Sequence, residues 1–255
     1  MDLNADLGEG APFDAELMSL VTSANVACGA HAGDEETMRS TMALALLHGV
    51  SIGAHPGYRD RANFGRREIA IGAAEAAALV EDQLGLARAA AQREGARLSH
   101  VKLHGAFYNA AARDPELAES VAAAVKRTDP SLALFALAGS MAVAAGLRHG
   151  LRTIGEAFFD RAYRSDGSLV PRSEPGALIA DEATAVSQVL QLVRAGSVPV
   201  LGGGPPVTIA AETVCVHGDG PRAVAFARRL RAALAEAGVS VRAFGRQRTN
   251  RSFGH

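Results

Sequence analysis

The 255-residue sequence predicts an α/β fold, a (β/α) barrel of seven to eight strands in a single domain over residues 1–255. Short apolar runs alternate along the chain with longer helical runs, which is the pattern of β/α units. Most helical runs end at a glycine that is followed at once by the next apolar run. Polar residues follow at least six of the apolar runs, and a closed barrel brings the carboxyl ends of all its strands together.

The predicted strands are short and rich in apolar residues, as strands buried on both faces are. They span residues 2–6, 24–28, 50–54, 100–103, 133–137, 152–156, 213–216 and 239–244. An open doubly wound sheet would also accommodate these strands, but its functional residues gather at one switch point. The spread of polar residues over so many strand ends therefore favours the barrel.

The predicted helices carry start and stop signals. Asp34 is placed to cap the helix that follows it, and Gly49 is placed to end that helix. Asp114 puts a capping residue directly before Pro115, which suits the first helical position. The other predicted helices span residues 73–94, 140–149, 182–195 and 221–238.

Two long loops and one hairpin interrupt this rhythm. The loops at 56–71 and 158–176 are long for a compact domain, and such loops are often functional. The segment 198–211 contains a glycine-proline turn between apolar residues, which predicts a small hairpin.

Composition excludes several classes of protein. The 26 basic residues nearly balance the 27 acidic ones, for a net charge of −1, so no overall field attracts nucleic acid or an anionic membrane. No apolar run reaches the ~18–20 residues that span a bilayer, and the start MDLNADLGEG lacks the pattern of a signal peptide. We therefore expect a soluble, cytoplasmic protein in which Cys28 and Cys215 are buried free thiols.

Common nucleotide and hydrolase motifs are absent from the sequence. The glycines at 202–204 lead into two prolines rather than the Lys-Ser/Thr of a P-loop, and no G-x-G-x-x-G or G-x-S-x-G motif occurs. No cysteine pair or H-E-x-x-H motif indicates a zinc site. A metal held between strands stays open, because Asp6 with His31, His55 or His104 would offer suitable ligand atoms.

Ionisable side chains recur just after the predicted strands. Four of the eight histidines, His31, His55, His104 and His217, occupy that position. One such histidine is usually a turn residue, but four in the same position argue for a site. Lys102 ends a strand and is one of only two lysines in an arginine-rich chain. The other candidates near strand ends are Asn4, Asp6, Asn25, Arg66, Glu156, Asp160, Arg161 and Asp219.

Some neighbouring residues have ordinary structural explanations. Asp34 suits a helix cap, Glu9 a solvent-facing acid, and Arg66 a solvated loop arginine. Tyr108 reads as a core residue, and His100 has no supporting functional pattern.

Six ordered blocks over nearly the whole chain resemble the LamB/YcsF family, which is known as the A-type component of 5-oxoprolinase. The blocks are DLNADLGEG (2–10), NVACGAHAGDEETM (25–38), GVSIGAHPGYRDRANFGRRE (49–68), VKLHGAFYN (101–109), GEAFFDRAYRSDGSLVPRSEPGALI (155–179) and TVCVHGDGP (213–221). Leu103 stands where proline is usual, Phe107 where leucine is usual, and residues 59–63 also depart from the pattern. The charged and imidazole positions all match.

The resemblance implies a barrel of the glycoside hydrolase/deacetylase type. It also implies ATP-dependent opening of 5-oxo-L-proline (pyroglutamate) to L-glutamate, with ATP as co-substrate and Mg²⁺ beside it. The chain would act with two other subunits, of the B and C types. Since no nucleotide motif occurs here, the partner subunits are one place where ATP would bind.

The chemistry of a lactam suggests roles for the candidate residues. Its amide is resonance-stabilised, and phosphorylation of the oxygen would open the ring carbon to attack by water. We assign water activation to Asp6 or His55 by hypothesis. Lys102 and His104 would stabilise the oxyanion or the departing phosphate.

The remaining roles are proton transfer and substrate binding. Glu156, Asp160 or His217 would supply or relay a proton to the leaving nitrogen. Asn4 and Asn25 would orient the reacting groups, and Arg66 or Arg161 would clamp a carboxylate or phosphate. The full substrate-binding set is Asn4, Asn25, His31, Arg66, Arg161 and Asp219.

Two other functions stay open. A metal-dependent amide hydrolase or carbohydrate deacetylase that works without ATP would share the barrel and the Asp/His-rich mouth. A non-catalytic subunit would only bind substrate and organise its partners. So many ionisable groups argue against the latter, because burying charges without a use is costly.

Overall fold

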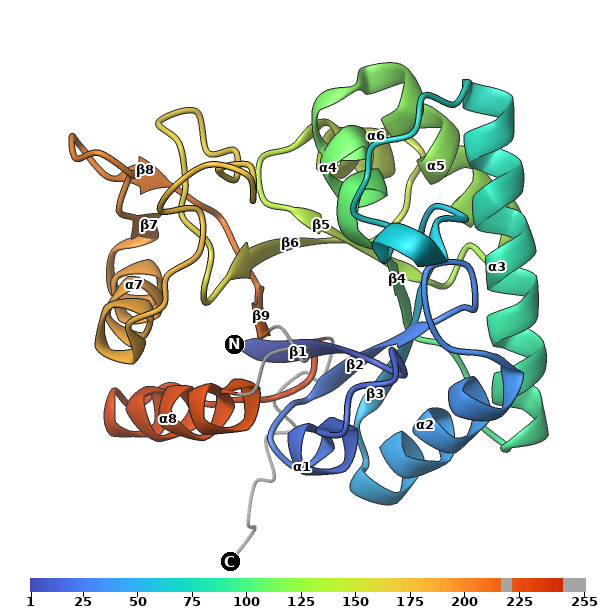
Figure 1. Ribbon diagram of the computed structural model, residues 1–255, viewed down its shortest axis with the longest axis horizontal. Coiled ribbons are helices and arrows are strands. Elements are labelled where there is room, and N and C mark those ends of the chain that lie inside the picture. Colours follow the sequence, from blue (N-terminus) through green and yellow to red (C-terminus); the bar gives the residue numbers. More distant parts are fainter. Residues whose placement is uncertain (217–221, 245–255) are drawn as a thin grey trace, which may run out of the picture.

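The computed structural model describes residues 1–216 and 222–244, and seven parallel strands form a closed barrel at its centre (Figure 1). The strands are β1 (Asp2–Leu7), β2 (Ser23–Ala27), β3 (Ser51–His55), β4 (His100–Lys102), β5 (Ala133–Leu137), β6 (Thr153–Phe158) and β9 (Thr213–Val216). Each strand pairs with the next along the chain up to β6, and β9 closes the ring between β6 and β1. The predicted barrel is confirmed, with seven strands.

Helices surround the barrel and cover the outer faces of its strands (Figure 1). They are α1 (Asp14–Met18), α2 (Glu35–His48), α3 (Ala73–Arg93), α4 (Gly105–Arg113), α5 (Pro115–Thr128), α6 (Met141–Arg148), α7 (Glu182–Ala195) and α8 (Ala223–Glu236), with a 3₁₀ turn at Arg61–Asn63. Helix α4 was not predicted as a separate element. It begins directly after His104 and so belongs to the mouth of the barrel.

The helix boundaries follow the sequence signals. The side chain of Asp34 accepts a hydrogen bond from the Thr37 N–H at the start of α2, and Gly49 ends that helix. Asp114 caps α5 in the same way, with Pro115 in the first turn. These caps satisfy backbone donors that a helix cannot pair internally.

The hairpin predicted at 198–211 is confirmed, and the strand predicted at 239–244 is wrong. The hairpin pairs β7 (Ser197–Val198) with β8 (Val207–Thr208) beside α7. Residues 239–244 form no strand because β9 already closes the ring and leaves no free edge in the barrel. Instead, Phe244 packs its ring against Phe135 and His100 at the amino-terminal end of the barrel.

Gly53 makes room inside the barrel for the imidazole ring of His100. The register aligns Asn25 of β2 with Gly53 of β3, and Gly53 with His100 of β4. A Cβ atom on Gly53 would lie 2.2 Å from Nε2 of His100. The missing side chain at Gly53 therefore lets the His100 ring reach into the barrel.

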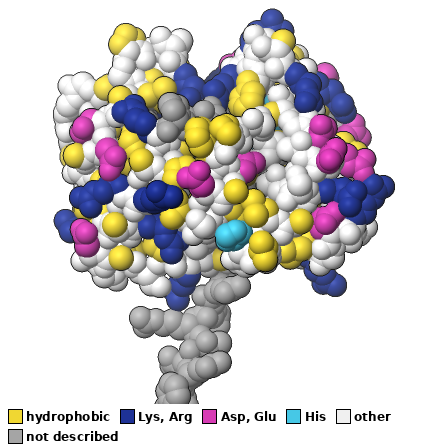
Figure 2. Space-filling model, turned by 60° about the horizontal axis from the view of Figure 1, so that its bottom comes forward, with side chains coloured by type: hydrophobic (Ala, Val, Ile, Leu, Met, Phe, Trp, Pro, Cys, Tyr) yellow, Lys and Arg dark blue, Asp and Glu magenta, His cyan; other side chains and the backbone are white. Residues whose placement is uncertain are grey.

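Charged side chains of both signs mix with hydrophobic ones on one face of the molecule (Figure 2). None of the described helices is both long enough and apolar enough to cross a membrane.

Candidate active site

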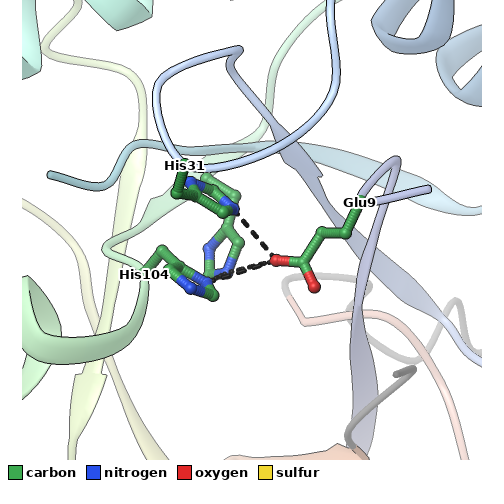
Figure 3. Close-up of side chains that lie close together, drawn as sticks. Glu9, His31 and His104 are labelled. Carbon is green, nitrogen blue, oxygen red and sulfur yellow. Dashed lines mark hydrogen bonds and ion pairs between the residues drawn. The ribbon is translucent and has the colours of Figure 1, made fainter. Parts of the chain in front are cut away.

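Five strand-end side chains converge inside the mouth of the barrel. Glu9 lies in the loop after β1, His31 follows β2, and His55 is the last residue of β3. Lys102 ends β4, and His104 directly precedes α4. Figure 3 shows the Glu9 carboxylate pointing at the rings of His31 and His104 from the opposite side of the mouth. Because parallel strands end at one face, residues far apart in the sequence meet here.

Lys102 forms the lower layer of this site. Its Nζ lies 2.9 Å from Asp6 Oδ1, 3.0 Å from Glu156 Oε1 and 3.0 Å from Cys215 Sγ. Burial lowers the pKa of Lys102, but Asp6, Cys215 and Glu156 outweigh this effect and hold it well above its ordinary value. The site therefore has a fixed positive charge between two carboxyl groups.

Amide side chains hold the two carboxyl groups in place. Asn25 Nδ2 donates to Asp6 Oδ1 at 2.8 Å and to Asn4 Oδ1 at 2.7 Å. Asn4 Nδ2 donates to Glu156 Oε1 at 2.9 Å. His100 Nε2 lies 2.8 Å from Asn25 Oδ1 and braces this amide from below.

The imidazoles of His55 and His104 form the upper layer. Nδ1 of His55 lies 2.8 Å from the carbonyl oxygen of Lys102, and Nε2 of His104 lies 2.9 Å from that of Phe64. A carbonyl oxygen only accepts hydrogen bonds, so these two ring nitrogens carry protons. The other nitrogens, His55 Nε2 and His104 Nδ1, lie 3.0 Å apart and face Glu9.

Glu9 lies among the imidazoles rather than in solvent. Its Oε1 is 3.0 Å from His31 Nε2, 3.2 Å from His104 Nδ1 and 3.8 Å from His55 Nε2. Burial raises the pKa of Glu9, but the imidazoles of His104 and His31 outweigh this and hold it well below its ordinary value. Glu9 is therefore an anion, and its interpretation as a solvent-facing acid is wrong.

Burial disfavours the charged form of two neighbouring imidazoles, those of His31 and His104. It lowers the pKa of His31 to about 4 and also lowers the pKa of His104. The His31 ring stacks on that of His104, with centroids 3.7 Å apart and planes 2° from parallel. Nδ1 of His31 is buried without a hydrogen-bond partner among the described residues.

A small polar pocket of about 40 Å³ lies directly over these layers and has Asp6, Glu9, Lys102 and His104 in its wall. It opens into a groove of about 830 Å³, and Arg66, Arg161 and Arg172 line both cavities. Guanidinium groups at such a mouth suit a carboxylate or a phosphate.

Three buried polar atoms near the pocket are poorly satisfied by the described residues. Arg161 Nε has no hydrogen-bond partner among them, and Tyr108 Oη and Glu156 Oε2 have none besides each other. Burial and the nearby Glu156 carboxyl group hold the pKa of Tyr108 well above its ordinary value, so its hydroxyl remains a donor. Buried polar groups are rarely left unpaired, and these atoms fit a polar ligand or water at this place.

The structure thus brings most of the sequence candidates together. Asn4, Asp6, Asn25, His31, His55, Lys102, His104 and Glu156 meet in the two layers, with Arg66 and Arg161 at the mouth. Asp160 follows β6 but lines neither cavity. His217 and Asp219 lie outside the described residues. Asp34 is an exposed helix cap, which confirms its interpretation as a structural residue.

Sequence reasoning missed Glu9 and Arg172 as site residues, and also His100, Tyr108 and the second role of Cys215. Strand alternation was the available signal for His100, because it is two residues before Lys102 and both side chains point inward. Cys215 is buried, as expected, but its Sγ also contacts Lys102. Nothing in the sequence pattern singles out Tyr108, whose role depends on how α4 meets β6.

Comparison with known proteins adds two findings. The profile of the LamB/YcsF family matches residues 1–249. A lactam utilization protein from Thermus thermophilus is 44% identical with a TM-score of 0.88, over 96% of this chain and 99% of that chain.

A more distant structure shares the fold alone. A protein from Enterococcus faecalis proposed to act in cellobiose-phosphate cleavage is 15% identical to this chain. The TM-score is 0.55, over 94% of this chain and 95% of that one. The barrel is therefore common to proteins with little sequence in common.

Proposed function

This chain belongs to the LamB/YcsF family, and we propose that it is the lactam-opening subunit of an ATP-dependent 5-oxoprolinase. It would convert 5-oxo-L-proline to L-glutamate with two partner subunits of the B and C types. The family and the 44% identical lactam utilization protein support a role in lactam hydrolysis. The observation that carries the proposal is the buried Lys102, held between Asp6 and Glu156 beneath an arginine-lined mouth.

The reaction needs activation before hydrolysis, because a lactam amide is resonance-stabilised. Transfer of the γ-phosphoryl group of ATP to the lactam oxygen removes that resonance and gives ADP. Water then adds to the ring carbon, the C–N bond breaks, and the nitrogen takes a proton. A second water releases phosphate, so ATP, 5-oxoproline and two waters give ADP, phosphate and glutamate.

Charge stabilisation falls to Lys102. The ammonium group lies in the wall of the pocket, on a side chain that is only 2% exposed. A fixed cation in such surroundings stabilises the negative charge that develops on the carbonyl oxygen of the lactam far better than one in solvent does.

Two groups of residues can move the protons. Asp6 Oδ2 lies 3.3 Å from His55 Nε2, so this pair can take a proton from the attacking water. Tyr108 keeps its hydroxyl proton beside the Glu156 carboxyl group and can relay one to the leaving nitrogen. Arg66, Arg161 and Arg172 are placed to hold the substrate carboxylate or the phosphoryl group.

The test is glutamate release from 5-oxoproline by the purified chain, with and without ATP and the two partner subunits. We expect glutamate and ADP only in the complete mixture. No glutamate in any combination, with the partners folded and bound, would contradict the proposal. Glutamate formed without ATP, and lost on chelation, would instead support a metal-dependent amide hydrolase.

A further inference from the structure

When His55 and His104 are neutral, three acceptor atoms in the upper layer point at one another with no proton between them. His55 and His104 each give their only ring proton to a backbone carbonyl when they are neutral. Their remaining nitrogens, His55 Nε2 and His104 Nδ1, then present lone pairs 3.0 Å apart. Oε1 of Glu9 faces both of them, at 3.8 Å and 3.2 Å.

Such an arrangement is unfavourable unless a cation lies between the atoms. Lone pairs that face each other repel, and the side chains of these three residues are at most 4% exposed, so water screens them little. Three carboxyl groups, of Asp6, Glu9 and Glu156, also share this interior with a single ammonium group, that of Lys102, among the described residues. The cluster therefore favours an added positive charge.

The spacing of these atoms fits a small transition-metal ion. A tetrahedral ion with ligands at about 2.0–2.1 Å holds its ligand atoms about 3.3 Å apart. The distances among the three atoms are 3.0, 3.2 and 3.8 Å, and Asp6 Oδ2 lies 3.3 Å from His55 Nε2 as a fourth oxygen. Two imidazoles and one or two carboxylates are ligands typical of Zn²⁺ and similar divalent ions.

The surroundings are also those of metal-binding histidines. In metal sites the second ring nitrogen is usually held by a carbonyl or carboxylate, which fixes the tautomer. Here the carbonyl groups of Lys102 and Phe64 do this for His55 and His104. His31 Nε2 lies 3.0 Å from Glu9 Oε1 and orients the carboxylate.

His31 itself supports the site without binding the ion. Its ring lies parallel to that of His104 at 3.7 Å, and the lone pairs of an imidazole lie in the ring plane. Two parallel rings at this separation cannot aim their lone pairs at one ion. We therefore propose that Glu9, His55 and His104 bind one divalent transition-metal ion of the Zn²⁺ class, with Asp6 beside it and His31 positioning Glu9.

The ion would lie within reach of the pocket. Asp6, Glu9 and His104 all line it, so a ligand position not taken by the protein would face whatever occupies that space. Binding of the ion does not depend on the proposed reaction, and it can be measured without substrate.

Calorimetric titration of the full chain with ZnCl₂, after treatment with a chelator, tests the inference. We expect saturable binding of one ion per chain and a rise of several degrees in the thermal unfolding midpoint. His55→Gln, His104→Gln and Glu9→Gln should each weaken binding by about 100-fold or more. His31→Gln should weaken it less, because that ring only positions Glu9.

His149→Gln is the matched control. His149 Nε2 lies 2.7 Å from Glu119 Oε2 and forms a histidine-carboxylate pair on the surface, so its loss should leave binding of Zn²⁺ unchanged. Failure of the wild-type chain to bind one Zn²⁺ saturably would overturn the inference. Equal affinities of the wild type and the His55→Gln and His104→Gln variants would overturn it as well.

Discussion

Lys102 is a residue whose charge the surrounding strands hold in place. Asp6 of β1, Glu156 of β6 and Cys215 of β9 all contact its ammonium group. A buried cation with such partners stays charged, and its removal leaves the carboxyl groups without a counter-charge. Lys102 is therefore tied both to the proposed chemistry and to the stability of the mouth.

Replacement of Lys102 by Met should abolish most of the activity. Loss of a charge that acts on the transition state lowers turnover by about 10²-fold or more. Asp6 and Glu156 would also lose their counter-charge, which should lower the unfolding free energy by about 3–5 kcal/mol. Turnover by the complete mixture and denaturant unfolding measure the two effects.

Lys126→Met provides the control for this variant. Lys126 is the other lysine of the chain, and its Nζ donates to the carbonyl of Gly150 on the exposed surface at 3.0 Å. Its replacement should leave turnover unchanged. Near-normal turnover of Lys102→Met in the assembled complex would contradict the role of the buried charge.

The burial of His100 makes the free energy of unfolding depend on pH. Burial lowers its pKa from 6.5 to about 3. Between these values the unfolded chain binds a proton that the folded chain does not, so the unfolding free energy falls as pH falls. His100 alone should account for a loss of about 4 kcal/mol over this range.

Denaturant unfolding at several pH values measures this effect. His100→Asn should flatten the fall in unfolding free energy between pH 6.5 and 3. His48→Asn, at an exposed histidine in the last turn of α2, should not change it. A wild-type profile no steeper than that of His100→Asn would contradict the assignment.

The sequence predicted those site residues whose position depends only on where a strand ends. His31, His55, Lys102 and His104 each follow or end a strand, and a closed barrel is enough to bring them together. Glu9 is different, because it reaches the imidazoles only through the path of the loop after β1. The conformation of such a loop depends on its tertiary contacts rather than on local pattern.

At the scale of elements, local sequence signals predicted where helices begin and end better than they predicted which segments join the sheet. The caps at Asp34 and Asp114 satisfy backbone donors within one turn, so the sequence alone suffices to place them. The segment 239–244 has a strand-like composition but finds no free edge in the barrel, since β9 pairs on both sides. Sheet membership is decided by neighbours that local composition does not encode.

Gly53→Ala should destabilise the barrel by displacing a ring. A Cβ atom there would lie 2.2 Å from His100 Nε2, and His100 is stacked on Phe135 with centroids 4.2 Å apart. The ring has little room to move, so overpacking should cost about 1–3 kcal/mol of unfolding free energy. Chemical denaturation measures this cost.

Gly85→Ala is the control for Gly53→Ala. Gly85 is an exposed residue in α3, and a Cβ atom there would meet nothing within 4 Å. Alanine should stabilise the helix by about 0.5–1 kcal/mol. Destabilisation by both variants alike would show that the space around Gly53 is not the cause.

At the scale of the whole molecule, the residues proposed to react and those proposed to bind the substrate come from different parts of the barrel. Its strand ends supply the buried charges, whereas the loops after β3 and β6 supply the arginines of the mouth. The arginine-lined groove of about 830 Å³ continues outward from the small pocket. A substrate or a partner that delivers an anionic group would approach through this groove.

Arg66→Gln should weaken substrate binding more than it slows chemistry. Arg66 lines both cavities and lies over the Phe64 ring, 5.0 Å from its centroid. Loss of its charge should raise KM for 5-oxoproline by about 10-fold with a smaller change in kcat. Arg59→Gln, on the same loop but paired with Asp82 at 2.9 Å, should leave both constants unchanged. A lower kcat with unchanged KM in Arg66→Gln would contradict a binding role.

The most direct test of the account follows ADP and glutamate together in the complete mixture of chain, partner subunits, ATP and 5-oxoproline. We predict equal amounts of the two products with the wild-type chain, and almost no glutamate with Lys102→Met. Glutamate formed at the wild-type rate without ATP, or at an undiminished rate by the Lys102→Met complex, would contradict it.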